Sequence, residues 1–374
     1  MFGRQRFVGG VMSKLSSVIG LVFFSSVLTA LMGHTQGASP PTVSTDIYDI
    51  KSRDDIHKFS AREVRTLVQL ENTRHQGRGT VPHPILVYCF DEETFHYTGG
   101  KYQNEEIKYR LHVPKNIRAG RKYPLIVHLH GIGEAGSNNT SSLVHLHSIL
   151  PVLIGPESED FFMLVTQCPE ETPHWSFRSA KDGTLDVLAA VMEHVIAEHP
   201  IDTKRITTTG VSSGGWGVWE LLLKYPDTFA GAVPTSCGVP PQLQRLTALK
   251  KTPVWSFVNK GDIDPASNQT AIHAISSSGG SMVLTECDAS GHNAWRPAME
   301  DYHCFRWMLA QKRGSWFSPL PGTIVHTPHS WLFILAMYII PLAIIVFFVF
   351  QSWDTIYERI SDLYQAIRER IGSH

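Results

Sequence analysis

Residues Arg205–Gly217 read RITTTGVSSGGWG, and this stretch decides the fold. Its β-branched run, Ile206–Thr209, suits a buried strand and ends at Gly210. A helix-like run, Trp216–Tyr225, follows the glycines. Between them lies a Gly-x-Ser-x-Gly pattern centred on Ser212, and a strand, turn and helix in this order hold a serine hydroxyl in an exposed, strained position. The context therefore favours a nucleophilic serine over a Ser/Gly-rich loop without chemistry.

The composition of the chain limits the classes of function. The chain has 374 residues, of which 43% are hydrophobic, and its formal net charge is -1. This length allows one sizeable domain with additional segments. Nucleic-acid binding requires a basic face, so the near-neutral charge predicts no nucleic-acid partner.

Residues 1–38 are expected to direct export. Arg4, Arg6 and Lys14 precede an uncharged run, Leu15–Gly33. A basic region followed by an apolar one is typical of a secretory signal peptide or an uncleaved anchor. Both alternatives place the middle of the chain on the extracytoplasmic side of a membrane.

A second hydrophobic segment, Trp331–Phe350, holds no charged residue and has about the length that a bilayer requires. Trp331 and Trp353 flank it, as interfacial aromatic residues do. The polar tail, residues 351–374, carries isoleucine and leucine at three- and four-residue spacing. This spacing predicts an amphipathic cytoplasmic helix that lies on the membrane or self-associates. We therefore predict a transmembrane helix over residues 331–350 and the lipid bilayer as a partner.

Between these ends, residues 39–84 are interpreted as a linker with a short helix, residues 85–315 as the main domain, and residues 316–330 as a second linker. Ser60 and Glu63 form the capping-box pattern that opens a helix reaching about Asn72. Beyond residue 85, short apolar runs alternate with longer amphipathic runs, which predicts an α/β domain with a mostly parallel sheet and helices on both faces. With the turn at Ser212, this is the arrangement of an α/β-hydrolase.

The elements of this domain are predicted from the same alternation. The predicted strands are Tyr109–Val113, Leu125–Leu129, Phe161–Thr166, Arg205–Thr209, Ala230–Pro234, Val254–Val258 and Ser281–Glu286. The predicted helices are Gly183–Glu198, Gly215–Lys224, Ala266–Ser278 and Met299–Gln311.

A serine nucleophile needs a general base and an acid that orients the base, and in an α/β-hydrolase both follow the serine in the chain. His292 is the preferred base because it lies in a glycine-containing loop just after a predicted strand. His273 and His303 lie on predicted helices and are interpreted as structural. The loop after strand Val254–Val258 supplies two candidate acids, Asp262 and Asp264, of which Asp262 is preferred and the other is a turn residue.

The oxyanion hole needs backbone N–H groups that point at one position. One donor is expected to be the N–H of Ser213, which follows the nucleophile, and the other to come from Gly131, Ile132 or Gly133, in a glycine-rich loop after a strand. Ser213 is also a rival nucleophile, but in its register the first glycine of the pattern is missing.

Cysteine and histidine residues give weaker signals. Cys287 and Cys304 bracket the candidate base and can be bridged in an exported domain, the alternative being that all five cysteines are small buried residues. His128 and His130 alternate along a strand but have no third ligand at a suitable spacing, so we expect neither a metal nor another cofactor.

Further motifs carry a resemblance to a known family over roughly residues 105–313. The motifs are Tyr109-Arg-Leu-His-Val-Pro114, Lys122-Tyr-Pro-Leu-Ile-Val-His-Leu-His-Gly131, Gly133-Glu-Ala-Gly-Ser-Asn138, Gln167-Cys-Pro169 with Trp175, Gly210–Gly215, Pro226-Asp227, Pro253-Val-Trp255 and Gly291-His-Asn-Ala-Trp295. Together they resemble the predicted peptidases related to polyhydroxybutyrate-depolymerase-like and feruloyl-esterase-like carboxylesterases. The resemblance implies an α/β-hydrolase fold, Ser212 as nucleophile, Asp262 as acid, His292 as base, and ester hydrolysis.

The chain departs from this family at three places. Ser213 stands where the family has methionine or another apolar residue, and Val258-Asn259 stands where it has His-Gly. The aspartate loop is also one residue short. These departures leave the choice between Asp262 and Asp264 open.

The sequence therefore predicts a membrane-tethered serine hydrolase that acts on a small-molecule or polymeric ester through an acyl-enzyme. Trp175, Trp216 and Trp295 are candidates for lining the substrate pocket, the alternative being that they are core aromatic residues. A serine peptidase of the same fold and a catalytically silent binding module are the rival interpretations. Asn138, Asn139 and Asn268 begin Asn-x-Ser/Thr sequons and are candidate glycan acceptors.

Overall fold

The computed structural model describes residues 60, 63–64, 66, 82–154, 160–171, 174–175, 183–241, 243–262, 265–288, 291–300, 303–323 and 360–363. The chain divides into two compact units, Met1–Ile47 and Tyr48–His374, and the described residues all belong to the second. The predicted export segment and the predicted span Trp331–Phe350 lie outside the described residues. Within the described part, no helix has the length and apolar character that crossing a membrane requires.

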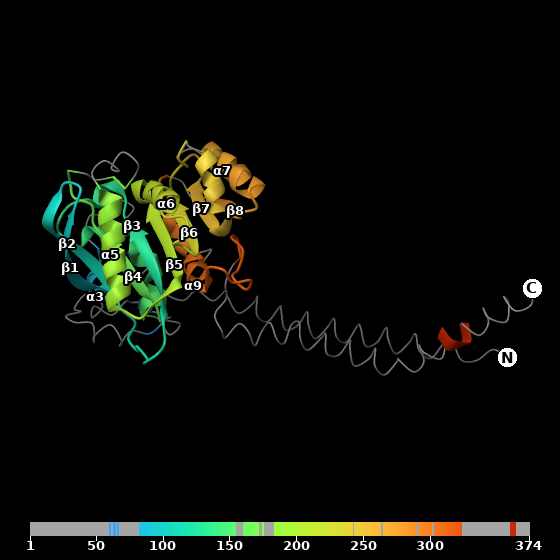
Figure 1. Cartoon of the computed structure of the whole chain (residues 1–374), viewed down its shortest axis with the longest axis horizontal. Coiled ribbons are helices and arrows are strands. Elements are labelled where there is room, and N and C mark those ends of the chain that lie inside the picture. The colour runs from blue at the N-terminus through green and yellow to red at the C-terminus, as the bar shows by residue number, and fades with distance from the viewer. Residues whose placement is uncertain are drawn as a thin grey trace, which may run out of the picture. The chain divides into compact units, whose positions relative to one another are not determined.

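Eight strands of the described chain form one sheet, in the order β1-β2-β4-β3-β5-β6-β7-β8 (Figure 1). The pairs β1–β2 and β2–β4 are antiparallel, and the other neighbouring pairs are parallel. The mostly parallel sheet expected from the sequence is therefore confirmed. The strands are β1 (Asp91–Gly99), β2 (Tyr102–His112), β3 (Tyr123–Leu129), β4 (Phe162–Thr166), β5 (Ile201–Val211), β6 (Gly231–Thr235), β7 (Val254–Asn259) and β8 (Met282–Cys287).

The antiparallel edge of the sheet is the part that the sequence pattern missed. No strand was predicted over β1, and β2 begins well before the predicted strand Tyr109–Val113. The residues of β1 are exposed or half-buried, so this strand lacks the apolar alternation that marks a half-buried strand. By contrast, every residue of β3, β4, β6 and β7 is buried, as expected of parallel strands covered on both faces.

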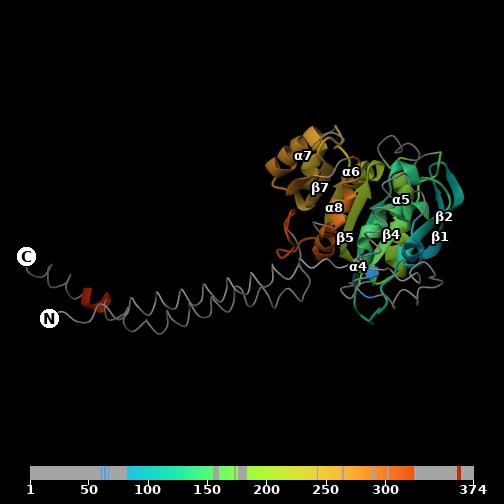
Figure 2. The ribbon, with the colours of Figure 1, turned by 180° about the vertical axis from the view of Figure 1, so that it is seen from behind.

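Helices cover both faces of the sheet. The helices α5 (Thr184–Glu198) and α6 (Ser213–Lys224) share a core with Leu125, Val127 and Leu129 of β3 (Figure 1). The helices α4 (Leu150–Ile154) and α8 (Trp295–Glu300) are seen from behind in Figure 2. Further helices of the described domain are α3 (Pro84–Tyr88), α7 (Pro265–Ser277) and α9 (Cys304–Ala310), with the 3-10 helices η3 (Ile132–Glu134), η4 (Ser141–Ile149) and η6 (Leu243–Lys251).

The predicted helix Met299–Gln311 is wrong as a single element. It overlaps two short helices, because α8 ends at Glu300 and α9 begins at Cys304. His303 immediately precedes α9 with a φ of 49°. A residue in the left-handed region cannot continue a right-handed helix, so the backbone at His303 separates the two helices.

The predicted capping box at Ser60 is confirmed. The N–H and the hydroxyl of Ser60 both donate to Glu63 Oε2, at 2.7 and 2.6 Å, and the Glu63 N–H donates to Ser60 Oγ at 3.3 Å. The hydrogen bonds from the Ser60 hydroxyl and N–H lower the pKa of the Glu63 carboxyl. Such reciprocal bonds satisfy backbone donors that the first turn of a helix leaves unpaired.

The five cysteines are buried and none of them forms a disulfide, so the bridge between Cys287 and Cys304, one of the two alternatives left by the sequence, is not formed. The Cys304 thiol instead donates to Met299 Sδ at 3.6 Å, and burial raises its pKa. The cysteines therefore behave as small apolar residues, which was the alternative interpretation of the sequence.

The three sequons lie in the folded domain, where their asparagine amides make structural hydrogen bonds. Asn139 and Asn268 are 1% and 0% exposed, and Asn268 pairs with Ser256 Oγ and Cys237 O. Asn138 Oδ1 accepts the N–H of Ser141 at 3.0 Å. The amides of Asn139 and Asn268 therefore belong to the interior, which is a position that a bulky glycan cannot occupy.

Candidate functional site

Ser212 lies at the turn between β5 and α6, as the sequence predicts. Its backbone has φ 55° and ψ -115°, a conformation that is strained for a residue with a side chain. The Ser212 N–H donates to Thr235 O at 3.0 Å, and the Ser212 carbonyl accepts the Trp216 N–H at 3.1 Å. Hydrogen bonds on both sides therefore hold the strained residue in place.

The two glycines of the motif allow backbones to approach closely at this turn. A Cβ on Gly214 would lie 2.1 Å from Leu129 O and 2.5 Å from His130 O. A Cβ on Gly210 would lie 2.4 Å from the carbonyl oxygen of Gly214. These distances are far below a van der Waals contact, so Gly214 is required where α6 packs on the end of β3, and Gly210 is required where the last residues of β5 pack on the start of α6.

Asp262 and His292 are brought together beyond the ends of β7 and β8. Asp262 Oδ1 lies 2.7 Å from His292 Nδ1. The Asp262 side chain is 3% exposed and that of His292 is 41% exposed, so the acid is buried and the imidazole faces the surface. A carboxylate that accepts the Nδ1 proton leaves Nε2 as the basic nitrogen. Of the two predicted acids, Asp262 makes this contact, and Asp264 lies outside the described residues.

Asn259, the last residue of β7, holds the loop that carries the histidine. Its Nδ2 donates to Gly291 O at 2.5 Å and to Asn293 Oδ1 at 2.6 Å, so it contacts both neighbours of His292. Ser236 Oγ also accepts the Ala294 N–H at 2.8 Å. The sequence marked Asn259 only as a departure from the family pattern. In the sequence, a supporting role for Asn259 is indicated by its position just before the loop that carries Asp262.

The serine, the histidine and the aspartate lie at the same edge of the sheet. Ser212 follows β5, Asp262 follows β7 and His292 follows β8, and these strands run parallel. Among the described residues, the hydrogen bonds join His292 to Asp262 and do not join it to Ser212. Hydrogen bonds of this kind are often long in unliganded enzymes and shorten when the substrate is bound.

The loop after β3 lies directly against the turn at Ser212. The position that a Cβ of Gly131 would occupy is 3.7 Å from Ser212 Cβ. Before it, His130 accepts the Cys168 N–H on Nε2 at 2.9 Å, and its Nδ1 lies 2.6 Å from Gly131 O. Burial lowers the pKa of His130 to about 4, so the ring is neutral, and these contacts require the proton on Nδ1. The predicted oxyanion loop therefore starts from a fixed position beside the serine.

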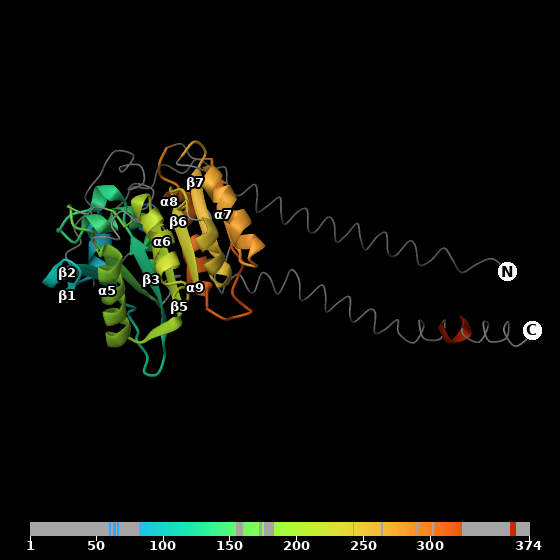
Figure 3. The ribbon, with the colours of Figure 1, turned by 45° about the horizontal axis from the view of Figure 1, so that its top comes forward.

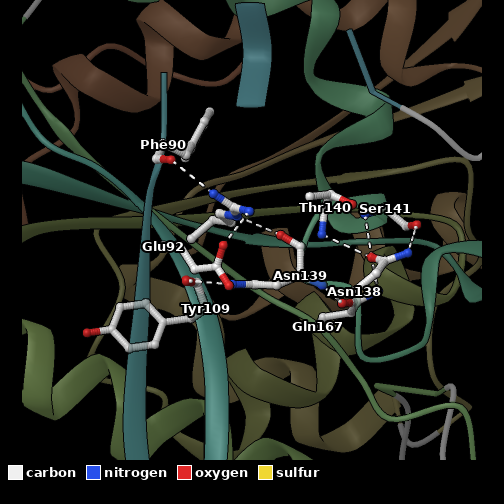
Figure 4. A network of polar contacts seen from close by, with 9 residues as sticks. Phe90, Glu92, Tyr109, Asn138, Asn139, Thr140, Ser141 and Gln167 are labelled. Atoms are coloured by element: carbon white, nitrogen blue, oxygen red, sulfur yellow. Dashed lines mark hydrogen bonds and ion pairs between the residues drawn. The ribbon is translucent and has the colours of Figure 1, made fainter. Parts of the chain in front are cut away.

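A network of buried polar groups holds the far end of the same loop (Figure 4). Arg110 Nε donates to Asn139 O at 2.7 Å, and Arg110 also donates to Phe90 O at 3.4 Å. The Asn139 N–H donates to Gln167 Oε1 at 2.7 Å, and Gln167 Nε2 donates to Glu134 O at 2.8 Å. The loop is thus tied to β2 and to the segment after β4, which limits the movement of the peptide groups near Ser212.

A second pair of an acid and a histidine lies beside this loop and was not predicted. Glu134 is 9% exposed, and its Oε1 lies 3.2 Å from His145 Nε2. Burial raises the pKa of the Glu134 carboxyl, but the hydrogen bond and charge of His145 outweigh burial and hold the pKa below its ordinary value. The pairing depends on the packing of η4 on the loop, so no local sequence pattern reveals it.

Two of the three predicted pocket tryptophans lie near these groups. Trp295 is buried, with its ring centroid 4.5 Å from that of His145 and 6.1 Å from that of His292. Trp175 is also buried and donates from Nε1 to His130 O at 3.1 Å. Trp216 is half-buried and packs near Gly238.

A cavity of about 400 Å³ adjoins the oxyanion loop. It is bounded by β2, the ends of the loop and of β4, and the first turns of α5. Among its lining residues are Gly136, Ser137, Gln167, Trp175 and Leu188. Its volume falls in the range of small-molecule sites. Within the described part of the chain, no three potential ligands gather into a metal site.

Several known hydrolases are similar to this chain. A profile of the prolyl oligopeptidase family matches residues 174–250. A thermostable esterase of known structure is 27% identical, with a TM-score of 0.52, and the match covers 61% of this chain and 64% of that one. The S-formylglutathione hydrolase of Staphylococcus aureus is 16% identical, with a TM-score of 0.47 and coverage of 59% and 96%. The acylaminoacyl peptidase of Pyrococcus horikoshii is 15% identical, with a TM-score of 0.46 and coverage of 61% and 42%.

The extent of these matches limits what they show. The chain spans less than two thirds of the length of the thermostable esterase and less than half of the acylaminoacyl peptidase. No curated protein sequence matches significantly. The sheet order, the turn at Ser212 and the likeness to the thermostable esterase show an α/β-hydrolase fold of the serine hydrolase type, the type to which esterases and peptidases belong.

Proposed function

We propose that the chain is a serine hydrolase that cleaves carboxylic esters through a covalent acyl-enzyme, with Ser212 as nucleophile, His292 as base and Asp262 as acid. The observation that carries the proposal is the 2.7 Å contact of a buried aspartate with a surface-facing histidine, at the same sheet edge as a strained serine. A histidine held in this way presents Nε2 as a base, which is what a serine hydroxyl requires in order to act as a nucleophile.

The reaction proceeds in two halves. His292 Nε2 takes the Ser212 hydroxyl proton as Oγ attacks the ester carbonyl, and the N–H of Ser213 and one N–H from Gly131, Ile132 or Gly133 stabilise the oxyanion. The C–O bond to the alcohol then breaks, and His292 gives the proton to the leaving oxygen. Water next attacks the acyl carbon and gives a proton to His292. The bond to Ser212 Oγ breaks, Oγ regains the proton, and the carboxylic acid leaves.

The choice of Ser212 over Ser213 has structural support. Ser213 is buried in the first turn of α6, whereas Ser212 is half-buried at the turn before it, so a substrate reaches the Ser212 side chain more readily. The Ser213 N–H, at the first position of α6, lies where the positive end of the helix dipole favours an anion. We therefore assign the backbone of Ser213, and not its side chain, to the reaction.

Part of the substrate is assigned to the cavity beside the oxyanion loop. Trp175 lines this cavity, and Trp295 lies beside the proposed base, so both remain candidates for contact with the substrate. Trp216, which packs near Gly238, is a further candidate on the helix that follows the serine. A small ester or the end of a polymeric ester fits the size of the cavity.

The proposal includes a membrane tether. The uncharged segment Trp331–Phe350 is long enough to cross a bilayer, and the basic and apolar start of the chain favours export. The catalytic unit is then extracytoplasmic. Reconstitution of the full chain in vesicles, followed by protease treatment and flotation, tests the tether and the side on which the catalytic unit lies.

A serine peptidase of the same fold is the second candidate, because residues 174–250 match the prolyl oligopeptidase family. A catalytically silent binding module is the third. The experiment is labelling of the full chain with a fluorophosphonate probe, beside Ser212→Ala and Ser213→Ala. We expect the wild type and Ser213→Ala to react and Ser212→Ala to remain unlabelled. An unlabelled wild type would overturn the enzyme proposal in favour of the silent module.

Substrate assays separate the two enzymatic candidates. The wild type is offered p-nitrophenyl esters of increasing acyl length and a matched set of peptide anilides. Turnover of the esters without turnover of the anilides supports the esterase, whereas preferential cleavage of the anilides establishes the peptidase and contradicts the ester proposal.

A further inference from the structure

The segment after α9 carries large apolar side chains that are exposed to solvent. Trp316 is 98% exposed, Phe317 is 96% exposed and Leu320 is 69% exposed. Aromatic side chains of this size normally bury most of their surface. We call these three residues the aromatic tip. A folded domain that presents a Trp-Phe pair in this way exposes a surface suited to an apolar partner.

Hydrogen bonds fix the segment that carries the aromatic tip. The buried Trp307 donates from Nε1 to Pro319 O at 3.1 Å and to Leu320 O at 3.0 Å. Ser318 Oγ accepts the Lys312 N–H at 2.9 Å and donates to Lys312 O at 3.1 Å. The exposure of the tip is therefore built into the fold, and it does not result from a loose end of the chain.

The segment lies at the end of the sheet opposite Ser212. The Arg313 N–H donates to Lys204 O at 2.7 Å, near the start of β5, whereas Ser212 follows the last residue of β5. At about 3.3 Å per residue, the stretch of β5 from Lys204 to Ser212 spans roughly 26 Å. Figure 3 shows the segment in deep orange beside α9. The aromatic tip and the serine are thus separated by the length of the strand.

The sequence brings the aromatic tip close to the predicted span. Leu320 precedes Trp331 by eleven residues, which reach at most about 40 Å even when fully extended. Lys312, whose side chain is 50% exposed and pairs with Asp202 at 3.6 Å, lies on the same segment. A surface ion pair of this kind is weak, so the lysine is able to exchange the carboxylate for a lipid phosphate. Tryptophan beside basic residues is the side-chain combination that membrane interfaces favour.

We propose that Trp316, Phe317 and Leu320 insert into the interfacial layer of the bilayer that the predicted span crosses, which rests on the proposed membrane tether. The exposed apolar side chains of the tip and its short connection to the predicted span both argue for a lipid surface as the occupant. Insertion sets the orientation of the enzyme, because it turns the start of β5 toward the lipid and Ser212 away from it. The substrate is then a molecule that reaches the enzyme from the aqueous side, and not a lipid of the same membrane.

The test uses the full chain with a fluorophore at the tip. All five native cysteines are buried, so Trp316→Cys supplies a selectively reactive thiol for an environment-sensitive label. Gln269→Cys, at an exposed position on α7, is the matched control. Each labelled protein is reconstituted in vesicles of phosphatidylcholine and phosphatidylserine, with and without lipids that carry a quencher at a shallow depth. We expect a blue-shifted emission and loss of intensity for the label at 316 and neither for the label at 269.

Other outcomes overturn specific parts of the proposal. If the protein floats with the vesicles but the label at 316 is not quenched, the tether stands and the insertion is wrong. If the protein does not float, the tether itself fails. If labels at 316 respond to each other and not to the lipid quencher, a second copy of the chain covers the tip. Replacement of Trp316 and Phe317 with serine should leave turnover of a soluble ester unchanged, because neither side chain contacts the folded core.

Discussion

The Glu134 carboxylate lies 3.2 Å from His145 Nε2, beside the loop that packs against Ser212. His145 in turn packs on Trp295, with ring centroids 4.5 Å apart, and the Trp295 ring also lies 6.1 Å from that of His292. The proposed base therefore shares a tryptophan neighbour with a second acid and histidine pair.

This pair predicts a pH-dependent stability. The folded-state pKa of Glu134 lies below its ordinary value of 4.5, because the hydrogen bond and charge of His145 outweigh burial, which acts in the opposite direction. A lowered carboxyl pKa stabilises the fold above the ordinary value, and this stabilisation is lost as the pH falls through the folded-state pKa. The free energy of unfolding of the wild type should exceed that of Glu134→Gln at pH 7, and the difference should shrink below pH 4.5. Glu286→Gln, at an exposed position, is the control and should show no such trend.

Replacement of Asp262 tests the proposed acid. Asp262→Asn removes the charge that holds the His292 tautomer while it keeps the size of the side chain, so we expect kcat on esters to fall by a factor on the order of 10⁴. Unchanged circular dichroism and melting temperature serve as the control for folding. Ester turnover close to that of the wild type would contradict the assignment of Asp262 as the acid and would favour Asp264 in that role.

Asn259 is expected to act as a positioning residue. Asn259→Asp removes the Nδ2 donor that holds both neighbours of His292, and a misplaced catalytic group lowers kcat by up to about 100-fold. The KM should change little, because Asn259 does not contact the proposed substrate cavity. Lys260→Ala is the matched control, since its side chain is 67% exposed and pairs with the exposed Asp288. Equal losses in both variants would argue for a general effect of the loop and against positioning.

Arg110 should contribute more to stability than the glutamate with which it pairs. Arg110→Met leaves the buried carbonyls of Asn139 and Phe90 without a charged donor, which costs about 1–3 kcal/mol. The Glu92 side chain is 52% exposed, so Glu92→Gln should cost at most about 1 kcal/mol. Urea unfolding of both variants measures the two values. A larger loss for Glu92→Gln would mean that the surface ion pair, and not the bonds to the loop, holds this region.

The parts of the fold that the sequence predicts are those with strong local patterns. The β-branched run before Ser212 and the apolar runs of β3, β4 and β7 identify strands because parallel strands bury both of their faces. The strand β1 carries charged residues at a sheet edge, so it lacks such a pattern. The break between α8 and α9 results from the left-handed backbone conformation of His303, and a histidine in the sequence does not predict that conformation.

The candidate site shows the same division. The chain order of serine, acid and histidine predicted His292 as base and either Asp262 or Asp264 as acid, and the structure brings Asp262 and His292 into contact. The Glu134–His145 pair and the support from Asn259 depend on side chains that meet only after η4 and the loop after β8 have packed. Contacts between residues separated in the chain produce no periodic sequence pattern, so they could not be predicted from the sequence.

The absence of a disulfide among the five cysteines has a consequence for how the domain acquires its fold. All of them are buried, and no covalent cross-link joins distant parts of the chain. The unfolded chain therefore needs no thiol oxidation or disulfide shuffling before it can collapse, and reductants remove no bond on which the native state depends. The folded domain should therefore form equally well under reducing and under oxidising conditions.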